Sequence, residues 1–242
     1  MTLLKGFKIR TPYLLLLPGM AFLFTFFILP LINLAQTSTQ TPVGGGDTGQ
    51  YEQTLRFQNY FDAFIENREQ FGRSFLYATI ATVLALLIAY PLAYAIAFKG
   101  GKYKNFMLVL VIAPFFTSFL LRTIAWKQIF SDGGAIMQFV YSTGLMSTSD
   151  HFLGTDAAVI FGLTYNFIPF MTLPLFTTLE RFDVRLLEAG SDLYATPASV
   201  FRKVTLPLSM PGIISGTLLV FIPIAGDYVN ASQNFLGSSK TS

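Results

Sequence analysis

Five long apolar runs, separated by segments that hold the charged residues, dominate the pattern of the chain. About 20 consecutive apolar residues are needed for a helix to cross ~30 Å of hydrocarbon. The uncharged part of the third run is the shortest, and we extend it to Trp126 on the expectation that Arg122 snorkels to the membrane interface. The pattern predicts an all-α polytopic membrane protein with one transmembrane domain over residues 1–242. The predicted spans are 13–35, 74–98, 106–126, 157–179 and 209–226.

The composition supports a membrane protein. Of 242 residues, 52% are hydrophobic and only 12% are charged, and the mean hydropathy is +0.55. Ordinary soluble domains are about one quarter charged, so this composition is typical of a membrane protein. The chain has no cysteine, which rules out disulfides and metal sites built from thiolates.

Basic and acidic residues divide unequally between the two sides of the predicted spans. With the amino terminus inside, the inner segments hold ten basic and four acidic residues, a net charge of +6. The outer segments then hold six basic and nine acidic residues, a net charge of −3. Cytoplasmic loops carry an excess of Lys and Arg. We therefore expect a cytoplasmic amino terminus, an outer loop at 36–73 and a cytoplasmic loop at 181–208.

Shorter patterns predict helices between the spans. Helix-like spacing of apolar residues over Leu55 to Arg73 predicts a surface helix on the bilayer or on a partner. The patch Ile136 to Val140 is too short to span and is expected to be interfacial or re-entrant. In the cytoplasmic loop, Asp183 is expected to cap one short helix. Thr196 followed by Pro197 predicts the start of a second helix, which Leu206-Pro207 is expected to stop.

Prolines and polar residues inside the spans indicate either packing alone or a gated pathway. Each proline removes a backbone hydrogen bond, which lipid tolerates only where other helices or a water-filled cavity satisfy the freed carbonyl. The prolines are Pro91, Pro114, Pro169, Pro174 and Pro223. Polar residues at mid-span depth are expected to line such a pathway or to hydrogen-bond between helices. They are Thr164, Asn166 and Thr172.

Asp227 and Tyr228 follow the last apolar run at its outer end. A carboxylate and an aromatic ring there could meet a cation by charge and by the ring quadrupole. The alternative is an interfacial cap or a salt bridge without a role in transport.

The sequence predicts no catalytic, nucleotide or metal site. Residues 237–241 resemble the end of a phosphate-binding loop but lack the glycine that must directly precede Lys240. His151 is the only histidine, has no ligand cluster around it and is expected to be a solvated loop residue. No set of nucleophile, histidine and acid can be assembled. We therefore expect the chain not to be an enzyme.

The cytoplasmic loop resembles the EAA loop of permease subunits of binding-protein-dependent ABC importers. The matching residues are Glu188-Ala189-Gly190, Asp192-Leu193, Ala195, Phe201 and Val204-Thr205-Leu206-Pro207. Nearly the whole chain resembles the spermidine/putrescine type, through Ala113 to Ser118 with Arg122, Ile168 to Met171 and Ser209 to Ile214. The resemblance implies a MetI-like ABC permease helical bundle. Such permeases normally have six spans, so either a sixth is missing from the sequence after residue 236 or the carboxyl terminus stays outside.

The loop departs from the family pattern at two positions. Gly190 stands where the family usually has alanine, and Tyr194 stands where it has glycine. Glycine adopts the left-handed conformation freely, whereas tyrosine does not. The turn after the first short helix is therefore expected to be built differently.

The resemblance implies that this loop couples the permease to an ATPase. A helix from Asp183 to Leu193 would lie in a groove of an ATP-binding subunit, with carboxylates on basic or polar groups and apolar residues packed beside them. The coupling residues implied are Asp183, Leu187, Glu188, Ala189, Gly190, Asp192, Leu193, Tyr194 and Ala195. The pathway residues that we single out are Thr164, Asn166, Phe170, Asp227 and Tyr228.

The function implied is that of a non-catalytic subunit which forms, with a second permease, the pathway for a polyamine such as spermidine or putrescine. The partners implied are two ATP-binding subunits, the second permease, an extracytoplasmic substrate-binding protein and membrane lipid, with no nucleic acid. ATP and Mg would bind to the ATPase subunits, and this chain would hold no cofactor. The location implied is the bacterial inner membrane.

Three alternatives remain. The same kind of subunit could import iron, thiamine, sulfate or phosphonate. A secondary transporter without an ATPase predicts paired repeats and ion-coupling carboxylates at mid-span, and neither is visible. A membrane scaffold would not need five kinked spans around polar residues.

Overall fold

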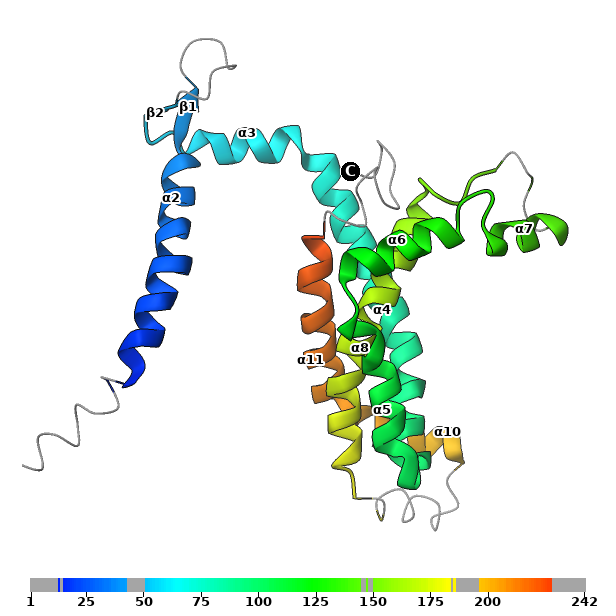
Figure 1. Cartoon of the computed structure of the whole chain (residues 1–242). Coiled ribbons are helices and arrows are strands. Elements are labelled where there is room, and N and C mark those ends of the chain that lie inside the picture. Colours follow the sequence, from blue (N-terminus) through cyan, green and yellow to red (C-terminus); the bar gives the residue numbers. More distant parts are fainter. Residues whose placement is uncertain are drawn as a thin grey trace, which may run out of the picture. The chain divides into compact units, whose positions relative to one another are not determined.

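The computed structural model describes residues 13, 15–42, 51–144, 147, 150–183, 185 and 196–227. The chain divides into two compact units, 1–68 and 69–242, and each is described by itself. The first unit contains one long apolar helix, a small hairpin and a short helix (Figure 1). The second unit contains the remaining helices.

The long helix of the first unit runs without a break over Leu15–Thr37. It includes a wider segment of π-helix, η1 (Phe24–Ile28), followed by α2 (Leu29–Thr37). Its side chains from Leu15 to Thr37 are all exposed in the chain alone. An apolar helix without a buried face is typical of a segment that lies in lipid or against another chain.

A two-stranded antiparallel hairpin follows, which the sequence pattern does not predict. Strands β1 (Gln40–Pro42) and β2 (Tyr51–Gln53) pair Thr41 with Glu52. Helix α3 (Gln58–Glu66) lies within the predicted surface helix 55–73 and is exposed over most of its length. The Asn59 amide donates to the carbonyl oxygens of Ser38 and Gln40 at 3.1 and 2.8 Å, which ties α3 to the hairpin.

The second unit is a bundle of helices (Figure 1). Its elements are α4 (Arg68–Lys99), η2 (Gly101–Tyr103), α5 (Lys104–Ile112), η3 (Ala113–Phe116), α6 (Phe119–Ile129), α7 (Ala135–Ser142), α8 (Asp156–Glu180), α10 (Pro197–Val200), η4 (Phe201–Thr205) and α11 (Leu206–Ala225). Here η2 and η3 are 3₁₀ turns and η4 is π-helix. The short helix α7 occupies the predicted apolar patch 136–140.

Four helices are long and apolar enough to cross a membrane, and a bent pair makes a fifth candidate. The four are 15–37, 68–99, 156–180 and 197–225. The bent pair joins 101–116 to 119–129 at 88°. The predicted fold class, an all-α polytopic membrane protein, is confirmed. The predicted span 106–126 thus falls on this bent pair of helices, with the bend just after the predicted kink at Pro114.

The core of the bundle contains a stripe of small side chains on α4. Alanines recur every three or four residues along one face of this helix and are fully buried, and they share one cluster with apolar residues of α8 and α11. The stripe consists of Ala78, Ala81, Ala85, Ala89 and Ala93. Small residues let helix backbones approach closely in a membrane, where packing and interhelical contacts drive association. Several large apolar residues of α4, such as Leu84, Leu87 and Ile88, are exposed instead.

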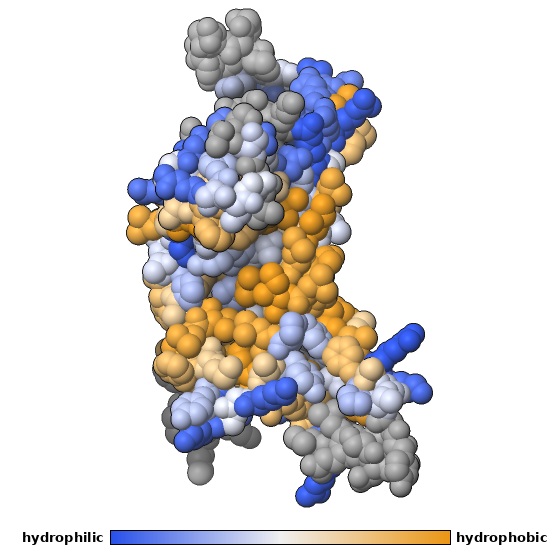
Figure 2. Space-filling view, turned by 90° about the vertical axis from the view of Figure 1, so that its right-hand side faces the viewer, coloured by the Kyte–Doolittle hydropathy of each residue, from blue (hydrophilic) through white to orange (hydrophobic). Residues whose placement is uncertain are grey.

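On the face shown in Figure 2, apolar side chains gather in the middle of the bundle, and hydrophilic side chains lie above and below them. The exposed apolar residues of α4 and α5 include Leu84, Leu87, Phe106 and Val109. A soluble protein rarely exposes so large an apolar surface. A bundle that is surrounded by the hydrocarbon of a membrane does expose such a surface.

Both π-helical segments directly precede a leucine-proline pair. In η1 the N–H of Leu29 donates to the carbonyl of Phe24, and in η4 the N–H of Leu206 donates to the carbonyl of Phe201. Each bond reaches back five residues instead of four, which widens the turn. A wider turn accommodates a proline ring that would clash with a regular helical turn. The helix therefore continues through Pro207, and the predicted stop at Leu206-Pro207 is wrong.

Candidate functional site

One end of the bundle, which we call the α10 end, carries the segment 181–196 between α8 and α10. Two contacts fix the places where this segment leaves and returns. The Lys104 ammonium pairs with the Glu180 carboxylate, which joins α5 to the last residue of α8. The rings of Phe98 and Phe182 lie 6.3 Å apart, which joins the end of α4 to the residue after Arg181. The start of the segment is thus held by α4, α5 and α8 together.

Asp183 accepts a hydrogen bond from the backbone N–H of Arg185 at 3.0 Å, as the predicted helix cap would. The other residues to which the sequence assigns coupling lie outside the described residues. They are Leu187, Glu188, Ala189, Gly190, Asp192, Leu193, Tyr194 and Ala195.

The segment ends at Thr196, whose hydroxyl accepts from the backbone N–H of Ser199 at 3.3 Å. Pro197 occupies the first turn, where its missing N–H is no loss. This prediction of a cap followed by proline is confirmed. The helix then runs without a break from Pro197 to Ala225, so α10 and the last apolar span form one continuous helix.

Helices α8 and α11 pack closely because two glycines of α11 face α8. A Cβ atom on Gly212 would lie 2.6 Å from the Thr178 hydroxyl oxygen and 3.0 Å from the carbonyl oxygen of Pro174. A Cβ atom on Gly216 would lie 2.8 Å from the sulfur of Met171. On the other side, the hydroxyls of Ser209 and Tyr90 hydrogen-bond at 2.9 Å. The helices that flank the 181–196 segment are therefore closely packed against each other.

The polar residues of α8 at mid-span are all buried. The Thr164 and Thr172 hydroxyls donate to carbonyl oxygens one turn earlier, those of Ile160 and Ile168, at 2.7 and 2.8 Å. These hydroxyls are satisfied within their own helix and do not bond between helices. Asn166 is 3% exposed, and neither atom of its amide has a hydrogen-bond partner in the structure. A buried amide without a partner is unfavourable, so it marks a place where an interaction from outside the chain would be gained.

The bent pair of helices lies beside this part of α8. Pro114 opens the 3₁₀ turn η3, and Thr117 and Ser118 then adopt extended backbone with ψ of 150° and 135°. The Thr117 hydroxyl donates to the carbonyl of Pro114 at 2.6 Å and holds the bend. The ring of Phe170, a predicted pathway residue, meets the ring of Phe115 edge-on at 5.0 Å. Phe170 thus contacts the break itself.

Arg122 lies one turn after the break and is 9% exposed. The expectation that it snorkels to the interface is wrong, because the bend turns α6 and places this side chain in the protein. Its guanidinium carbon is 6.0 Å from the ring centre of Phe115 and 5.9 Å from that of Phe119. A cavity of about 170 Å³ adjoins it, lined by Leu92, Leu110, Val111, Pro114, Arg122, Tyr165, Ile168 and Pro169.

Asp227 follows the carboxyl end of α11, opposite to the α10 end. Its backbone N–H donates to the carbonyl of Ile224 at 3.0 Å, and the preceding Gly226 N–H donates to Pro223 at 3.2 Å. These bonds end the helix in a turn and leave Asp227 half-buried. Tyr228, the second residue of the predicted cation site, lies outside the described residues.

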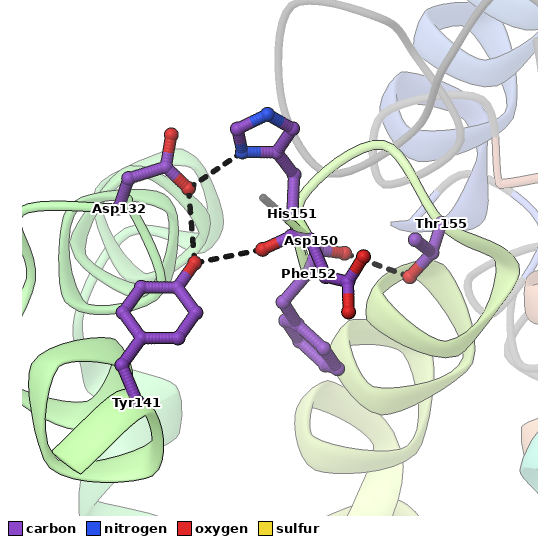
Figure 3. A network of polar contacts seen from close by, with 6 residues as sticks. All are labelled: Asp132, Tyr141, Asp150, His151, Phe152 and Thr155. Atoms are coloured by element: carbon purple, nitrogen blue, oxygen red, sulfur yellow. Dashed lines mark hydrogen bonds and ion pairs between the residues drawn. The ribbon is translucent and has the colours of Figure 1, made fainter. Parts of the chain in front are cut away.

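A network of polar contacts connects the turn after α6 with α7 and with the loop before α8 (Figure 3). The Asp132 carboxylate contacts His151 Nδ1 at 2.9 Å and accepts from the Tyr141 hydroxyl at 3.4 Å. That hydroxyl also donates to the backbone oxygen of Asp150 at 2.8 Å. His151 is exposed, as predicted, and in the described part of the chain it belongs to no group that could hold a metal. The network thus joins the turn after α6 to α7 and to the loop before α8.

The Asp132 carboxylate, by its hydrogen bond and its charge, raises the pKa of His151 above the ordinary 6.5. The contact therefore stabilises the loops at pH below the ordinary pKa, and this contribution is lost as pH rises through the raised pKa. We expect a titration of the single histidine resonance in ¹³C-labelled protein to give a pKa above 6.5. Asp132→Asn should lower that pKa toward 6.5, and Asp150→Asn should lower it less. An unchanged pKa in Asp132→Asn would contradict the contact.

The sequence of residues 81–240 matches the family model described as binding-protein-dependent transport system inner membrane component. This match covers more than half of the chain. The chain belongs to this family. Its members are transport permease subunits and not enzymes, so this permease is not an enzyme.

Named relatives of the permease agree with this assignment. The spermidine/putrescine transport system permease protein PotB of Haemophilus influenzae is 36% identical over 221 residues, which are 91% of this chain and 76% of that protein. PotB of Escherichia coli is 38% identical over 164 residues, which are 66% of this chain and 60% of that protein. The inner membrane ABC transporter permease protein YdcU of E. coli is 32% identical over 169 residues, which are 65% and 54%. The chain thus spans less than two thirds of the two E. coli relatives.

Two features of the permease were not anticipated from its sequence. One is the burial of Arg122 beside a cavity, and the only signal is a lone charge in an apolar run. The other is the pair of glycines on α11, whose spacing of four residues is a signal for close helix packing that could have been used.

Proposed function

We propose that the chain is a membrane-spanning subunit of an ATP-driven importer and forms, with a second permease, the pathway for a polyamine such as spermidine or putrescine. The observation that carries this proposal is the 36% identity to the Haemophilus influenzae protein over 91% of the chain. The family membership supports ATPase and substrate-binding partners. ATP and Mg would bind to two ATPase subunits, and this chain would hold no cofactor.

In this proposal the segment 181–196 is the contact with an ATPase subunit. Glu188 and Asp192 would meet basic or polar groups there, and Leu187, Ala189 and Leu193 would pack. The segment lies between α8, held by the Lys104 and Glu180 pair, and a helix that continues from α10 into α11. The close packing at Gly212 and Gly216 would make α8 and α11 follow the segment as one body when the ATPases close.

The proposed orientation places the α10 end and the amino terminus in the cytoplasm. The basic residues Lys99, Lys102, Lys104, Arg202 and Lys203 gather on the elements of this end. Positively charged loops are retained on the cytoplasmic side of the inner membrane. Asp227 would then lie at the outer mouth.

The proposed pathway residues are Asp227 and Tyr228 at the mouth and Thr164, Asn166 and Phe170 at mid-span. The amide of Asn166 is the best supported of these, because it is buried without a partner. The N–H groups of a polyamine ammonium would donate to the Asn166 amide oxygen.

The proposal is tested by uptake of labelled spermidine into vesicles that contain the chain with its second permease, ATPase and binding protein. We expect ATP-dependent uptake of spermidine that unlabelled putrescine inhibits and that thiamine, sulfate, phosphonate and iron do not inhibit.

Asp227→Asn should raise the apparent KM for spermidine about 5-fold or more, because a charge-assisted contact would be lost. The matched control is Asp62→Asn, which removes a carboxylate from exposed helix α3. Competition by thiamine or sulfate alone would overturn the substrate class, and equal KM values would overturn the role of Asp227.

A further inference from the structure

Arg122 is a buried cation that lacks hydrogen-bond acceptors. Its Nε and Nη1 atoms are buried and make no hydrogen bond, and no carboxylate of the described residues forms an ion pair with it. The Phe115 and Phe119 rings attract the guanidinium but accept none of these in-plane N–H bonds. A buried charge is retained in proteins when it is paired. An anion from outside this chain would therefore stabilise the buried Arg122 side chain by pairing with it.

The cavity beside Arg122 is positioned for that anion. Its volume of about 170 Å³ accommodates a carboxylate or a phosphate group, and among the described residues that line it the polar side chains are those of Arg122 and Tyr165. Ionisable residues inside membrane proteins face the bundle interior or a cavity and pair with one another. An anion in this cavity would thus meet one strong partner and an otherwise apolar wall.

The depth of the cavity favours a protein side chain over a lipid. Its lining residues Tyr165, Ile168 and Pro169 lie near the middle of α8, about 14–20 Å from Asp156 and about 17–23 Å from Glu180 at a rise of ~1.5 Å per residue. Phosphates of lipid headgroups lie at the two faces of a bilayer, so they are far from this depth. The proposed cargo is a cation and cannot supply the negative charge either.

The surface beside Arg122 is apolar and exposed in this chain. Phe116, in the turn before the break, is 85% exposed, and Leu121, next to Arg122, is 65% exposed. The break leaves these side chains on a helix edge without a covering element in the described chain. A neighbouring membrane helix would cover them and place a side chain at the cavity.

We propose that Arg122 binds a carboxylate side chain contributed by a membrane helix of the second permease subunit. The proposal rests on the proposed function, which supplies the second permease and the cationic cargo. The ion pair would form beside the break between α5 and α6 and would fix the second subunit against it. A buried pair of this kind sets which partner fits and in what register.

The test is assembly of the complete transporter, with the chain tagged and co-expressed with its second permease, ATPase and binding protein. Arg122→Glu should lower the second permease recovered with the chain about 30-fold or more, as expected when one partner of a buried pair is inverted. Arg122→Lys, which keeps the charge, should retain more of it. The matched control Lys127→Glu inverts an exposed charge on the same helix and should leave recovery unchanged.

Charge exchange then identifies the partner and decides between the sources of the anion. Each acidic residue in the spans of the second permease is changed to arginine in the Arg122→Glu background, and one exchange should restore assembly even if Arg122→Glu alone inserts poorly. The proposal is overturned if no exchange restores it, or if Arg122→Glu assembles normally and loses only a bound phospholipid, seen by native mass spectrometry. Assembly is measured without cargo, so a transporter that assembles but takes up no spermidine refutes the proposed function and leaves this test intact.

Discussion

Gly212→Val is expected to destabilise the bundle more than any other small change in α11. Even the first side-chain carbon would lie 2.6 Å from the Thr178 hydroxyl oxygen and 3.0 Å from the backbone oxygen of Pro174, and a backbone atom cannot rotate away. Overpacking of this kind costs about 1–3 kcal/mol or more. We expect the melting temperature of the purified permease to fall by about 5–10 °C. ATP-driven uptake should fall with it, because α8 and α11 would no longer move together.

Two other glycines provide the controls for this prediction. Gly216→Val meets first the sulfur of Met171, the end of a flexible side chain, so its effect should be smaller. Gly72→Val, on α4, meets nothing within 4 Å and should leave the melting temperature the same or slightly higher. Glycine inside a helix is itself destabilising by about 0.5–1 kcal/mol relative to alanine, so filling open space is favourable. Equal melting temperatures for Gly212→Val and Gly72→Val would contradict the close packing of α8 on α11.

The long apolar helices could be predicted from the sequence because lipid imposes a length and a composition that local residues reveal. The helix start at Thr196-Pro197 could be predicted for a similar reason, since a cap depends only on its immediate neighbours. Both signals are local, and both are found in the structure. The small hairpin at Thr41 and Glu52 could not be predicted, because its strands are three residues each and depend on pairing across a turn.

The break in the third span shows what the sequence does not settle. Four of the five prolines singled out from the sequence lie inside helices that continue through them, namely α4, α8 and α11, whereas the turn at Pro114 ends α5. The difference is that Thr117 and Ser118 follow Pro114 with extended backbone, and the Thr117 hydroxyl holds the turn. The burial of Arg122 follows from this bend. It could not be deduced from the sequence, where a charge near the end of an apolar run is expected to reach the membrane interface.

Glu188→Lys is expected to abolish uptake while leaving the permease in the membrane. The proposed role of the 181–196 segment makes Glu188 a contact to the ATPase, and inverting its charge there would oppose the basic or polar groups of the groove. Loss of one central contact of this kind lowers affinity by about 30-fold or more. The amount of ATPase subunit recovered with the tagged permease should fall accordingly. ATP hydrolysis should no longer respond to the loaded binding protein.

The control for this change is Glu66→Lys, which inverts an acidic charge on exposed helix α3 and should leave recovery and uptake unchanged. Both substitutions alter the net charge equally, so a difference between the two variants reports on the position of the residue and not on the total charge. Transmission requires a rigid path, which the close packing of α8 on α11 and the Lys104 and Glu180 pair would provide. Glu188→Lys with full uptake would therefore remove the coupling role from the loop, whereas lost uptake with normal ATPase recovery would assign Glu188 to transmission after docking.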